Sequence, residues 1–186
     1  MQQLNIPAGI GTHLDAPAHC IASGISVEQI SLNQLIVPCI VIDISDKAHE
    51  TYRINIDDIL KHEYEHGTIT KGCFVIFYTG WERWWHEPDK YRNNLNFPSL
   101  STAVAELLLT RHIVGIGIDT LSPDAGGLDF PVHQLILGAG KYIVENIFNA
   151  NSLPNTGAYV GIFPMKIAEG TESPVRLIGI IHEATQ

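Results

Sequence analysis

The sequence predicts a single α/β domain, and three observations support this prediction. Short runs rich in β-branched and aromatic residues alternate with segments of helical periodicity. The 186 residues are enough for one buried core, and no repeat, low-complexity tract or compositional shift marks a linker. Hydrophobic residues make up 45% and charged residues 17% of the chain, which is typical of globular proteins. We therefore expect one domain over residues 1–186.

Five apolar runs are predicted to be buried strands, because each is short, β-branched and bounded by turn residues. In chain order they span residues 36–45, 73–79, 112–119, 158–164 and 176–182.

Three segments between or after these runs are predicted to be helices. Asn55 can cap the first, over residues 56–61, where acidic residues in the first turn suit the helix dipole. Ser99 or Ser101 can cap the second, which carries an apolar stripe. Pro131 can begin a third, short helix.

Charge and hydropathy exclude several classes of partner. The chain has 11 basic and 20 acidic side chains, a formal charge of −9, whereas phosphate binding requires clustered lysine and arginine. No apolar run reaches the ~18 residues that a membrane span needs. The first residues have neither a basic start nor an apolar stretch typical of a secretory signal. We expect a cytoplasmic protein with no nucleic-acid or membrane partner.

The cysteines do not indicate a disulfide framework or a thiolate zinc site, because their number is odd and no CxxC spacing occurs. Cys39 and Cys73 lie in apolar runs and are expected to be small core residues. Cys20 directly follows His19, and we expect it to pack near that residue rather than to act as a ligand or reactive thiol.

A short segment, residues 11–19, brings together two imidazoles and a carboxylate. His13 and Asp15 share a face if the chain is extended, because side chains two apart point the same way in a strand. His19 joins them if the backbone stays roughly extended through Pro17. Such a convergence suits a divalent cation. The alternative is a loop in which histidines happen to cluster.

This segment, Gly-Thr-His-x-Asp-x-Pro-x-His, resembles the core of the signature of the cyclase family of metal-dependent hydrolases, which includes kynurenine formamidases and isatin hydrolases. Further segments are similar to the family in the same order: residues 41–45, 78–81, 117–124, 133 with 145–146, and 173–176. The resemblance covers nearly the whole chain from Gly11 onward. It implies a mixed β-sheet flanked by helices, in a swivelling β/β/α-like fold.

The resemblance also implies a ligand set. His133 and Glu145, twelve residues apart, match the pair with which relatives complete the metal cluster begun by His13 and Asp15. By itself, His133 would be an ordinary histidine of a helical face, and Glu145 a solvated position on an edge strand. The implied cofactor is one or two Zn²⁺ ions. Mn²⁺ is possible, because it tolerates more oxygen ligands.

The reaction implied by the family is hydrolysis of an amide-type C–N bond in a small molecule: an arylformamide, a lactam or a cyclic imide. A metal lowers the pKa of bound water from 15.7 toward ~7. His19 matches the proton-shuttling histidine of relatives, and imidazole suits that role near neutral pH. No Gly-x-Ser-x-Gly elbow indicates a serine nucleophile. Because relatives are commonly dimers or larger, we expect a homodimer or higher homo-oligomer.

The chain departs from the family pattern at two points. Gly9 stands where the signature usually carries a further histidine, four residues before His13. Only twelve residues precede His13, whereas relatives have a longer leading segment that helps to form the substrate pocket. Either the wall of the pocket is built differently, or a partner subunit supplies it. A relative that binds metal or a small molecule without turnover is therefore the alternative to an active hydrolase.

All three tryptophans fall within residues 81–88. They can line an apolar pocket for a ring-bearing substrate, or pack a long loop onto the domain or a subunit interface. Packing or an interface is the preferred interpretation, because burial of indole needs no ligand to explain it.

Other polar residues receive weaker expectations. Asp119 and Asp124 follow a predicted strand, in a kind of loop where α/β proteins tend to place binding groups. Asp119 is expected instead to fix that loop by hydrogen bonds. His112 and His182 lie at strand ends without a ligand partner nearby in the sequence. The histidines of polar stretches are expected to be exposed: His49, His62, His66 and His86.

Overall fold

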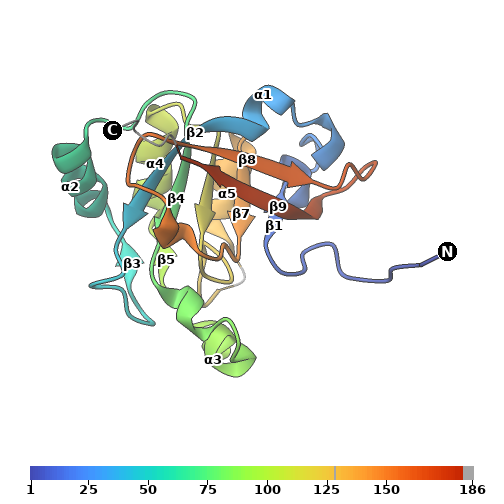
Figure 1. The fold of residues 1–186 in the computed structure, drawn as a ribbon, viewed down its shortest axis with the longest axis horizontal. Helices are drawn as coiled ribbons and strands as arrows, with labels where there is room; N and C mark the ends of the chain where they lie inside the picture. Colours follow the sequence, from blue (N-terminus) through green and yellow to red (C-terminus); the bar gives the residue numbers. More distant parts are fainter. Residues whose placement is uncertain (128, 182–186) are drawn as a thin grey trace.

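The computed structural model describes residues 1–127 and 129–181. Within these residues, seven strands form a closed barrel (Figure 1). Around the barrel the order is β1, β7, β6, β4, β2, β8 and β9, and β9 pairs with β1 again. The strands are β1 His13–Asp15, β2 Ile36–Asp43, β4 Phe74–Tyr78, β6 Gly115–Ile118, β7 Tyr142–Glu145, β8 Ala158–Pro164 and β9 Glu172–Ile180.

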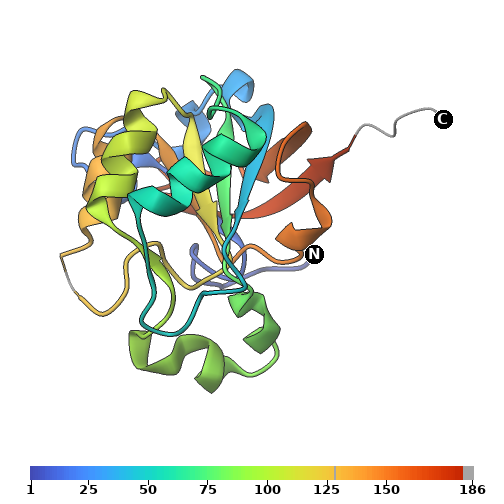
Figure 2. The ribbon, with the colours of Figure 1, turned by 90° about the vertical axis from the view of Figure 1, so that its left-hand side faces the viewer.

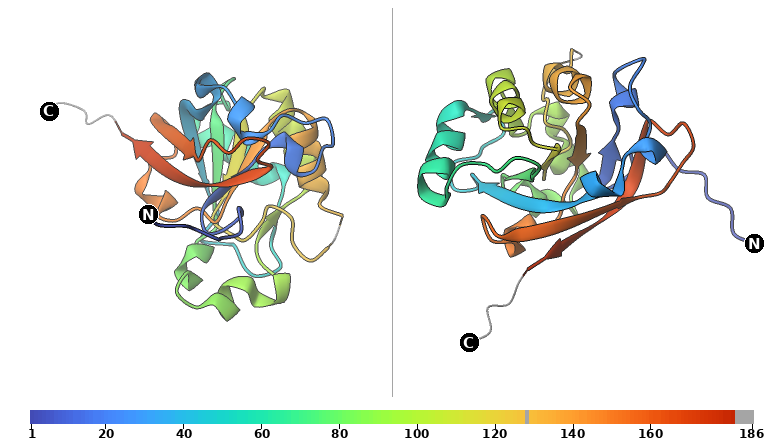
Figure 3. Two further views of the ribbon diagram at one scale, coloured as in Figure 1. Left: turned by 90° about the vertical axis from the view of Figure 1, so that its right-hand side faces the viewer. Right: turned by 90° about the horizontal axis from the view of Figure 1, so that it is seen from above.

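The barrel has a parallel half and an antiparallel half. Strands β2, β4, β6 and β7 are parallel neighbours, whereas β1, β8 and β9 make only antiparallel pairs. Helices α2 (Ile56–His66), α4 (Thr102–Thr110) and α5 (Pro131–Gly138) lie together on one side of the barrel, away from the β8–β9 hairpin (Figures 2 and 3). The structure is therefore the mixed α/β architecture that the sequence predicted.

The predicted helices are confirmed, and each begins where local chemistry placed its start. The side chain of Asn55 accepts a hydrogen bond from the backbone N–H of Asp57, at 2.9 Å. Ser101, rather than Ser99, caps α4 by accepting from the N–H of Val104. Helix α5 begins at Pro131. Proline is well tolerated there, because a backbone N–H at the first position of a helix has no acceptor within the helix.

The five predicted strands are also present: four of the runs contain β2, β4, β6 and β8, and the fifth covers the second half of β9, which begins four residues before the predicted start. The last predicted run ended at His182, which lies outside the described residues. Strands β1 and β7, with three and four residues, were not among the predicted runs. The edge-strand position considered for Glu145 is wrong, because β7 lies between β1 and β6 and the side chain is buried.

Two apolar clusters occupy the two faces of the barrel wall. Alternation along each strand sends one set of side chains inward and the other toward the helices. The interior cluster includes Leu14, Cys39, Phe74, Tyr142, Val144 and Val160. The cluster beneath the helices includes Ile42, Cys73, Phe77, Leu108, Ile136 and Ile143. The core positions predicted for Cys39 and Cys73 are therefore confirmed.

A glycine in β6 makes room inside the barrel. A Cβ atom on Gly117 would lie 2.9 Å from the ring of Phe74, so a side chain there would displace the aromatic ring. Phe74 in turn stacks on Tyr142 across the barrel interior, with ring centroids 5.6 Å apart. The small residue of β6 thus allows large neighbours on β4 and β7 to fill the core.

The tryptophan segment packs a lobe that projects from one end of the barrel (Figure 1). Trp81 is buried with Tyr91 and Phe97, and its indole N–H donates to the backbone carbonyl of Tyr91 at 2.8 Å. The packing role is confirmed for Trp81.

The shorter elements are α1 Leu32–Leu35, α3 Pro88–Arg92, β3 Arg53–Ile54, β5 Ser99–Leu100, and the 3-10 turns η1 Pro17–His19, η2 Val27–Gln29, η3 Trp81–Trp84, η4 Asn93–Leu95 and η5 Ala150–Ser152.

One histidine differs from its expectation. His62 is buried, because it lies on the face of α2 that turns toward the barrel, with its ring 4.9 Å from that of His66.

Over residues 1–127 and 129–181, no helix has the length and apolar character needed to cross a membrane.

Candidate metal centre

The pairing of three adjacent strands places the predicted site residues on one face of the barrel wall. His13 lies opposite Glu145 of β7, and Asp15 lies opposite Glu172 of β9. Directly opposed residues of antiparallel strands share a face, so these four side chains point the same way, while Leu14 packs into the barrel interior. As predicted from their spacing, His13 and Asp15 meet, with Nε2 and Oδ1 3.6 Å apart.

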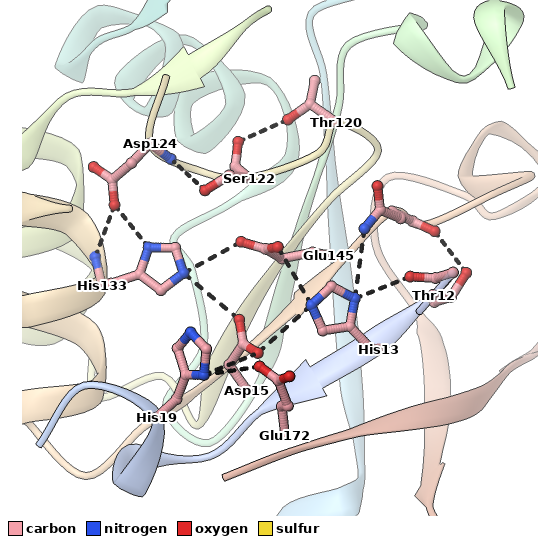
Figure 4. A network of polar contacts seen from close by, with 12 residues as sticks. Thr12, His13, Asp15, His19, Thr120, Ser122, Asp124, His133, Glu145 and Glu172 are labelled. Carbon is pink, nitrogen blue, oxygen red and sulfur yellow. Dashed lines mark hydrogen bonds and ion pairs between the residues drawn. The ribbon is translucent and has the colours of Figure 1, made fainter. Parts of the chain in front are cut away.

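Helix α5 brings His133 to the same place (Figure 4). Its Nε2 lies 3.5 Å from Oδ2 of Asp15 and 3.2 Å from Oε1 of Glu145. The other oxygen of Glu145, Oε2, lies 3.4 Å from Nε2 of His13. The structure therefore brings together the four residues expected to bind metal, although they come from distant parts of the sequence.

His19 reaches this cluster by a different route from the one expected. The backbone does not stay extended through Pro17, because residues Pro17–His19 form a 3-10 turn. The turn nevertheless returns the imidazole toward the strand, with Nδ1 4.0 Å from Oδ1 of Asp15. The same nitrogen lies 2.9 Å from Oε2 of Glu172.

Hydrogen bonds fix how two of the imidazoles face the cluster. Nδ1 of His133 lies 2.8 Å from Oδ2 of Asp124, and Nδ1 of His13 lies 2.9 Å from the carbonyl oxygen of Gly11. A carboxylate and a carbonyl only accept hydrogen bonds, so each Nδ1 is the donor. Both Nε2 atoms consequently face Asp15 and Glu145, which is the orientation seen when a histidine binds a metal.

Asp124 is a functional residue that sequence analysis did not identify in this role. It also accepts the backbone N–H groups of Val132 and His133 in the first turn of α5, each at 3.0 Å. Burial alone would raise the pKa of Asp124, but these hydrogen bonds outweigh burial and lower the pKa. Asp124 and His133 are nine residues apart, and this spacing matches neither the helical nor the strand period. Their pairing therefore becomes visible only once the start of α5 is known.

The two central carboxylates each have an oxygen without a partner. Oδ1 of Asp15 and Oε1 of Glu145 are buried and accept no hydrogen bond within the described residues. Asp15 is 1% exposed and Glu145 is 7% exposed. Buried polar atoms are normally satisfied, so an unsatisfied pair of carboxylate oxygens beside two imidazole nitrogens fits a bound cation.

The arrangement offers more than one set of three ligands. Donor atoms of His13, Asp15 and Glu145 all lie within 4.8 Å of one another, and so do those of Asp15, His19 and His133. Asp15 belongs to both sets. The residues present therefore fit one or two divalent ions, and imidazole with carboxylate is a common donor set for such ions.

The electrostatics of the cluster favour positive charge. Burial alone would lower the pKa of His133, but Asp124, Asp15 and Glu145 outweigh it and raise the pKa to about 12. Burial raises the pKa of Glu145, mainly because the side chain is removed from water. A metal ligand must be unprotonated, so binding of a cation here releases protons.

A cavity of about 450 Å³ opens beside the cluster. The site side chains line this cavity together with several apolar residues. The apolar lining comprises Pro7, Leu95, Phe97, Leu121 and Phe130. Cys20 also lines the cavity, and burial raises the pKa of its thiol, so it is not an activated nucleophile. The shape and polarity suit a small molecule with an apolar ring.

The residues that precede β1 also line this cavity, through Pro7 and Gly9. A neighbouring cavity of about 390 Å³ shares both residues and is lined in addition by Trp85. Of the tryptophans, Trp85 is therefore placed at a cavity wall, whereas Trp81 packs within the lobe.

Asp119 fixes a loop by hydrogen bonds, as predicted, but this is the loop after β4 and not the loop after β6 to which the prediction referred. Its carboxylate accepts from the N–H of Thr79 at 2.9 Å, from the Thr79 hydroxyl at 2.7 Å, and from the N–H of Trp81 at 2.8 Å. Burial raises its pKa to about 6. Its hydrogen-bonding capacity is used within the chain, and it does not take part in the metal cluster.

Comparison with known proteins decides the family. The model of the family described as putative cyclase matches residues 2–125. Isatin hydrolase of Roseibium aggregatum is 31% identical over 94% of this chain and 72% of its own length. The chain belongs to the cyclase family. Kynurenine formamidase of Polaromonas naphthalenivorans, another relative, is 26% identical over 96% of this chain and 73% of its own length.

The cyclase fold is shared in three dimensions. An isatin hydrolase bound to the product analogue thioisatinate superposes with a TM-score of 0.90 at 29% identity. The match covers 96% of this chain and 74% of the other. The predicted α/β fold of the cyclase family is confirmed, and relatives within this family are named as hydrolases.

Proposed function

We propose that the protein hydrolyses an amide-type C–N bond of a small, ring-bearing molecule, with a divalent metal held by His13, Asp15, His133 and Glu145. One observation carries the proposal: four potential ligands from two distant segments converge, and two of their buried oxygens accept no hydrogen bond from the residues that the structure describes. The site is proposed to hold one or two Zn²⁺ ions, with Mn²⁺ as the alternative metal. When bound, it supplies Lewis acidity, which lowers the pKa of water toward ~7 and polarises a carbonyl oxygen.

The protein residues hold this arrangement before any substrate arrives. Asp124 and the carbonyl of Gly11 keep the Nε2 atoms of His133 and His13 directed at the site. Because these partners bind the opposite nitrogen, they set the tautomer as well as the ring orientation. The carboxylates of Asp15 and Glu145 supply the negative charge that balances a dication.

His19 is proposed as the proton shuttle. It lines the cavity, and its side chain is 34% exposed, so it is accessible from the substrate side. Its Nδ1 faces the carboxylate of Glu172, which leaves Nε2 as the acceptor. Histidine exchanges protons readily near neutral pH, so it can take a proton from the attacking water and deliver it to the leaving nitrogen.

The substrate is proposed to be an arylformamide, a lactam or a cyclic imide. The apolar lining residues Phe97, Leu121 and Phe130 can contact a planar ring in the cavity that the polar cluster also lines. The names of two relatives, isatin hydrolase and kynurenine formamidase, support substrates of this kind.

Elemental analysis of protein purified without added metal, followed by assays with isatin, N-formylkynurenine and a cyclic imide, tests the proposal. We expect bound metal, hydrolysis of at least one compound, and loss of roughly 10²–10⁴-fold in rate in His19→Ala. His86→Ala, which changes an exposed histidine, is the matched control. Absence of hydrolysis with every compound in the metal-loaded protein would contradict the proposed activity.

A binding function without turnover is the second candidate, and Gly9 favours it. A Cβ at this position would lie 3.4 Å from Nε2 of His13, so the residue borders the site directly. If wild-type protein binds metal but hydrolyses none of the compounds, while Gly9→His gains activity, the chain is a weakened relative. Activity in the wild type removes this candidate.

We also propose a homo-oligomer, as expected from the family resemblance. The outer face of the β8–β9 hairpin carries exposed apolar side chains, including Tyr159, Phe163, Ile178 and Ile180. Contiguous exposed apolar residues commonly mark a protein interface. Light scattering coupled to size-exclusion chromatography tests this, and a monomeric mass at micromolar concentration would contradict it.

A further inference from the structure

Glu172 is a third carboxylate at the site and is not one of the four ligands proposed above. It lies directly opposite Asp15 in the β1–β9 pair, so the two side chains share a face. Its side chain is 24% exposed and lines the same cavity. Figure 4 shows its carboxylate beside His19 and Asp15. The position is therefore within the site and not on the outer surface.

The two oxygens of Glu172 have different surroundings. Oε2 lies 2.9 Å from Nδ1 of His19, which donates to it. Oε1 is turned toward Gly9, and lies 3.2 Å from the position that a Cβ of residue 9 would take. That same position is 3.4 Å from Nε2 of His13. The free oxygen of Glu172 thus faces the space beside a proposed metal ligand.

Gly9 leaves room for its neighbours, because a Cβ there would force the end of the Glu172 side chain to shift by a few tenths of an ångström. It is not among the glycines with positive φ, so an ordinary residue can adopt its backbone angles. A side chain at residue 9 and the carboxylate of Glu172 would compete for the same volume next to His13. The histidine that the signature usually carries at this point is absent, and a carboxylate has taken its place.

We propose that Glu172, which lies beside but outside the two sets of close donor atoms, turns toward the ion and supplies, through Oε1, the metal ligand that Gly9 lacks. The inference rests on the metal site of the proposed function. Its ligand set then contains two imidazole nitrogens and three carboxylates. Donation from His19 to Oε2 orients this carboxylate, as outer hydrogen bonds commonly do for ligating carboxylates.

A consequence for metal choice follows from this exchange of a nitrogen for an oxygen. Carboxylate ligands suit Mn²⁺, whereas imidazole ligands suit Zn²⁺ well. Zn²⁺ binds most sites more tightly than Mn²⁺ in absolute terms, so the meaningful quantity is the ratio of the two dissociation constants. Glu172 should shift that ratio toward Mn²⁺, and a histidine at residue 9 should shift it back.

Isothermal titration calorimetry of chelator-treated, full-length protein with Mn²⁺ and Zn²⁺ tests the assignment. Glu172→Gln keeps the shape but removes the charge, and Glu169→Gln, at a nearby exposed position, is the matched control. The third variant combines Gly9→His with Glu172→Ala, which clears space for the imidazole. Melting curves of each metal-free variant establish that it is folded.

We expect Glu172→Gln to weaken Mn²⁺ binding about tenfold or more and Zn²⁺ binding less, with Glu169→Gln unchanged. The double variant should shift the ratio of dissociation constants toward Zn²⁺ by about tenfold. If Glu172→Gln binds both ions like the wild type, Glu172 only positions His19, and this inference is wrong while the proposed function stands. If the wild type binds neither ion, the proposed function itself fails.

Discussion

Two sets of buried carboxylates lie at the same end of the barrel and differ in how their oxygens are used. Asp119, which follows β6, accepts hydrogen bonds from Thr79 and Trp81 on both of its oxygens. Glu145, at the end of β7, and Asp15, at the end of β1, each retain a buried oxygen that accepts no hydrogen bond within the described residues. A buried acid satisfied by its own chain holds a loop in place. A buried acid that its own chain leaves unsatisfied indicates a ligand from outside the chain.

The first prediction separates these two roles at the metal cluster. Glu145→Gln should lower metal affinity by more than about 100-fold and abolish turnover, because it removes a proposed ligand. The metal-free variant should be at least as stable as the metal-free wild type, since burial already raises the pKa of this carboxyl and the amide carries no charge. Metal analysis and thermal melts in chelator measure both quantities.

A marked loss of stability in metal-free Glu145→Gln, by more than about 2 kcal/mol, would show that this carboxylate has a structural role after all.

The second prediction concerns Asp119. Asp119→Asn should destabilise the protein by about 2–3 kcal/mol, because buried N–H donors at Thr79 and Trp81 lose charged acceptors. The melting temperature should fall by roughly 5–10 °C. Metal affinity of the folded fraction should be unchanged. Asp46→Asn, at an exposed position, is the control, and an equal loss there would contradict the comparison.

The third prediction lies between the two roles. Asp124 is satisfied by its own chain, yet it holds a proposed ligand, His133. Asp124→Asn should reduce metal affinity about 10–100-fold while the cavity wall and fold persist. Titration calorimetry measures this effect. Unchanged affinity would mean that the start of α5 alone is sufficient to orient the imidazole.

The smallest effect is expected from His62, whose Nε2 is also buried and has no hydrogen-bond partner in the described part of the chain. Burial lowers its pKa, and the charge of His66 adds to this effect, while Glu63 and Glu65 oppose it. The folded state therefore prefers the neutral imidazole of His62. Above pH ~6.5 the imidazole is neutral in both the folded and the unfolded state, so it does not reduce stability. Below pH ~6.5 the unfolded state takes up the proton more readily, so stability falls as the pH falls.

The free energy of unfolding should therefore fall on acidification through this range. Chemical unfolding at several pH values, compared between wild type and His62→Gln, measures it. An identical pH dependence in both proteins would assign the acid sensitivity to another group.

Much of the fold could be predicted from local chemistry. The caps at Asn55 and Pro131, and the longer apolar runs, marked helices and strands correctly. Strands β1 and β7 were too short to form recognisable runs, and closure of the barrel depends on pairing between residues more than a hundred positions apart. Such long-range pairing leaves no periodic trace in a single sequence.

The site was predictable only in part and for similar reasons. The spacing of His13 and Asp15 predicted that they share a face, whereas His133 and Glu145 came from the family resemblance. The roles of Asp124 and Glu172 depend on where α5 starts and on the register of β9 against β1. His62 was expected to be exposed because its neighbours in sequence are polar, but the orientation of α2 buries it.

The three-residue strand β1 joins the two ends of the barrel sheet, pairing with β7 on one side and β9 on the other. It is thus the seam at which the ring of strands closes, and few backbone bonds hold so short a segment. Proposed ligands lie on each of these three strands: His13 and Asp15 on β1, Glu145 on β7 and Glu172 on β9. An ion bound there would therefore link the amino-terminal segment to the carboxyl-terminal strand. Ion occupancy would then govern how often the ring opens, and amide exchange in β1 and β9 should report it.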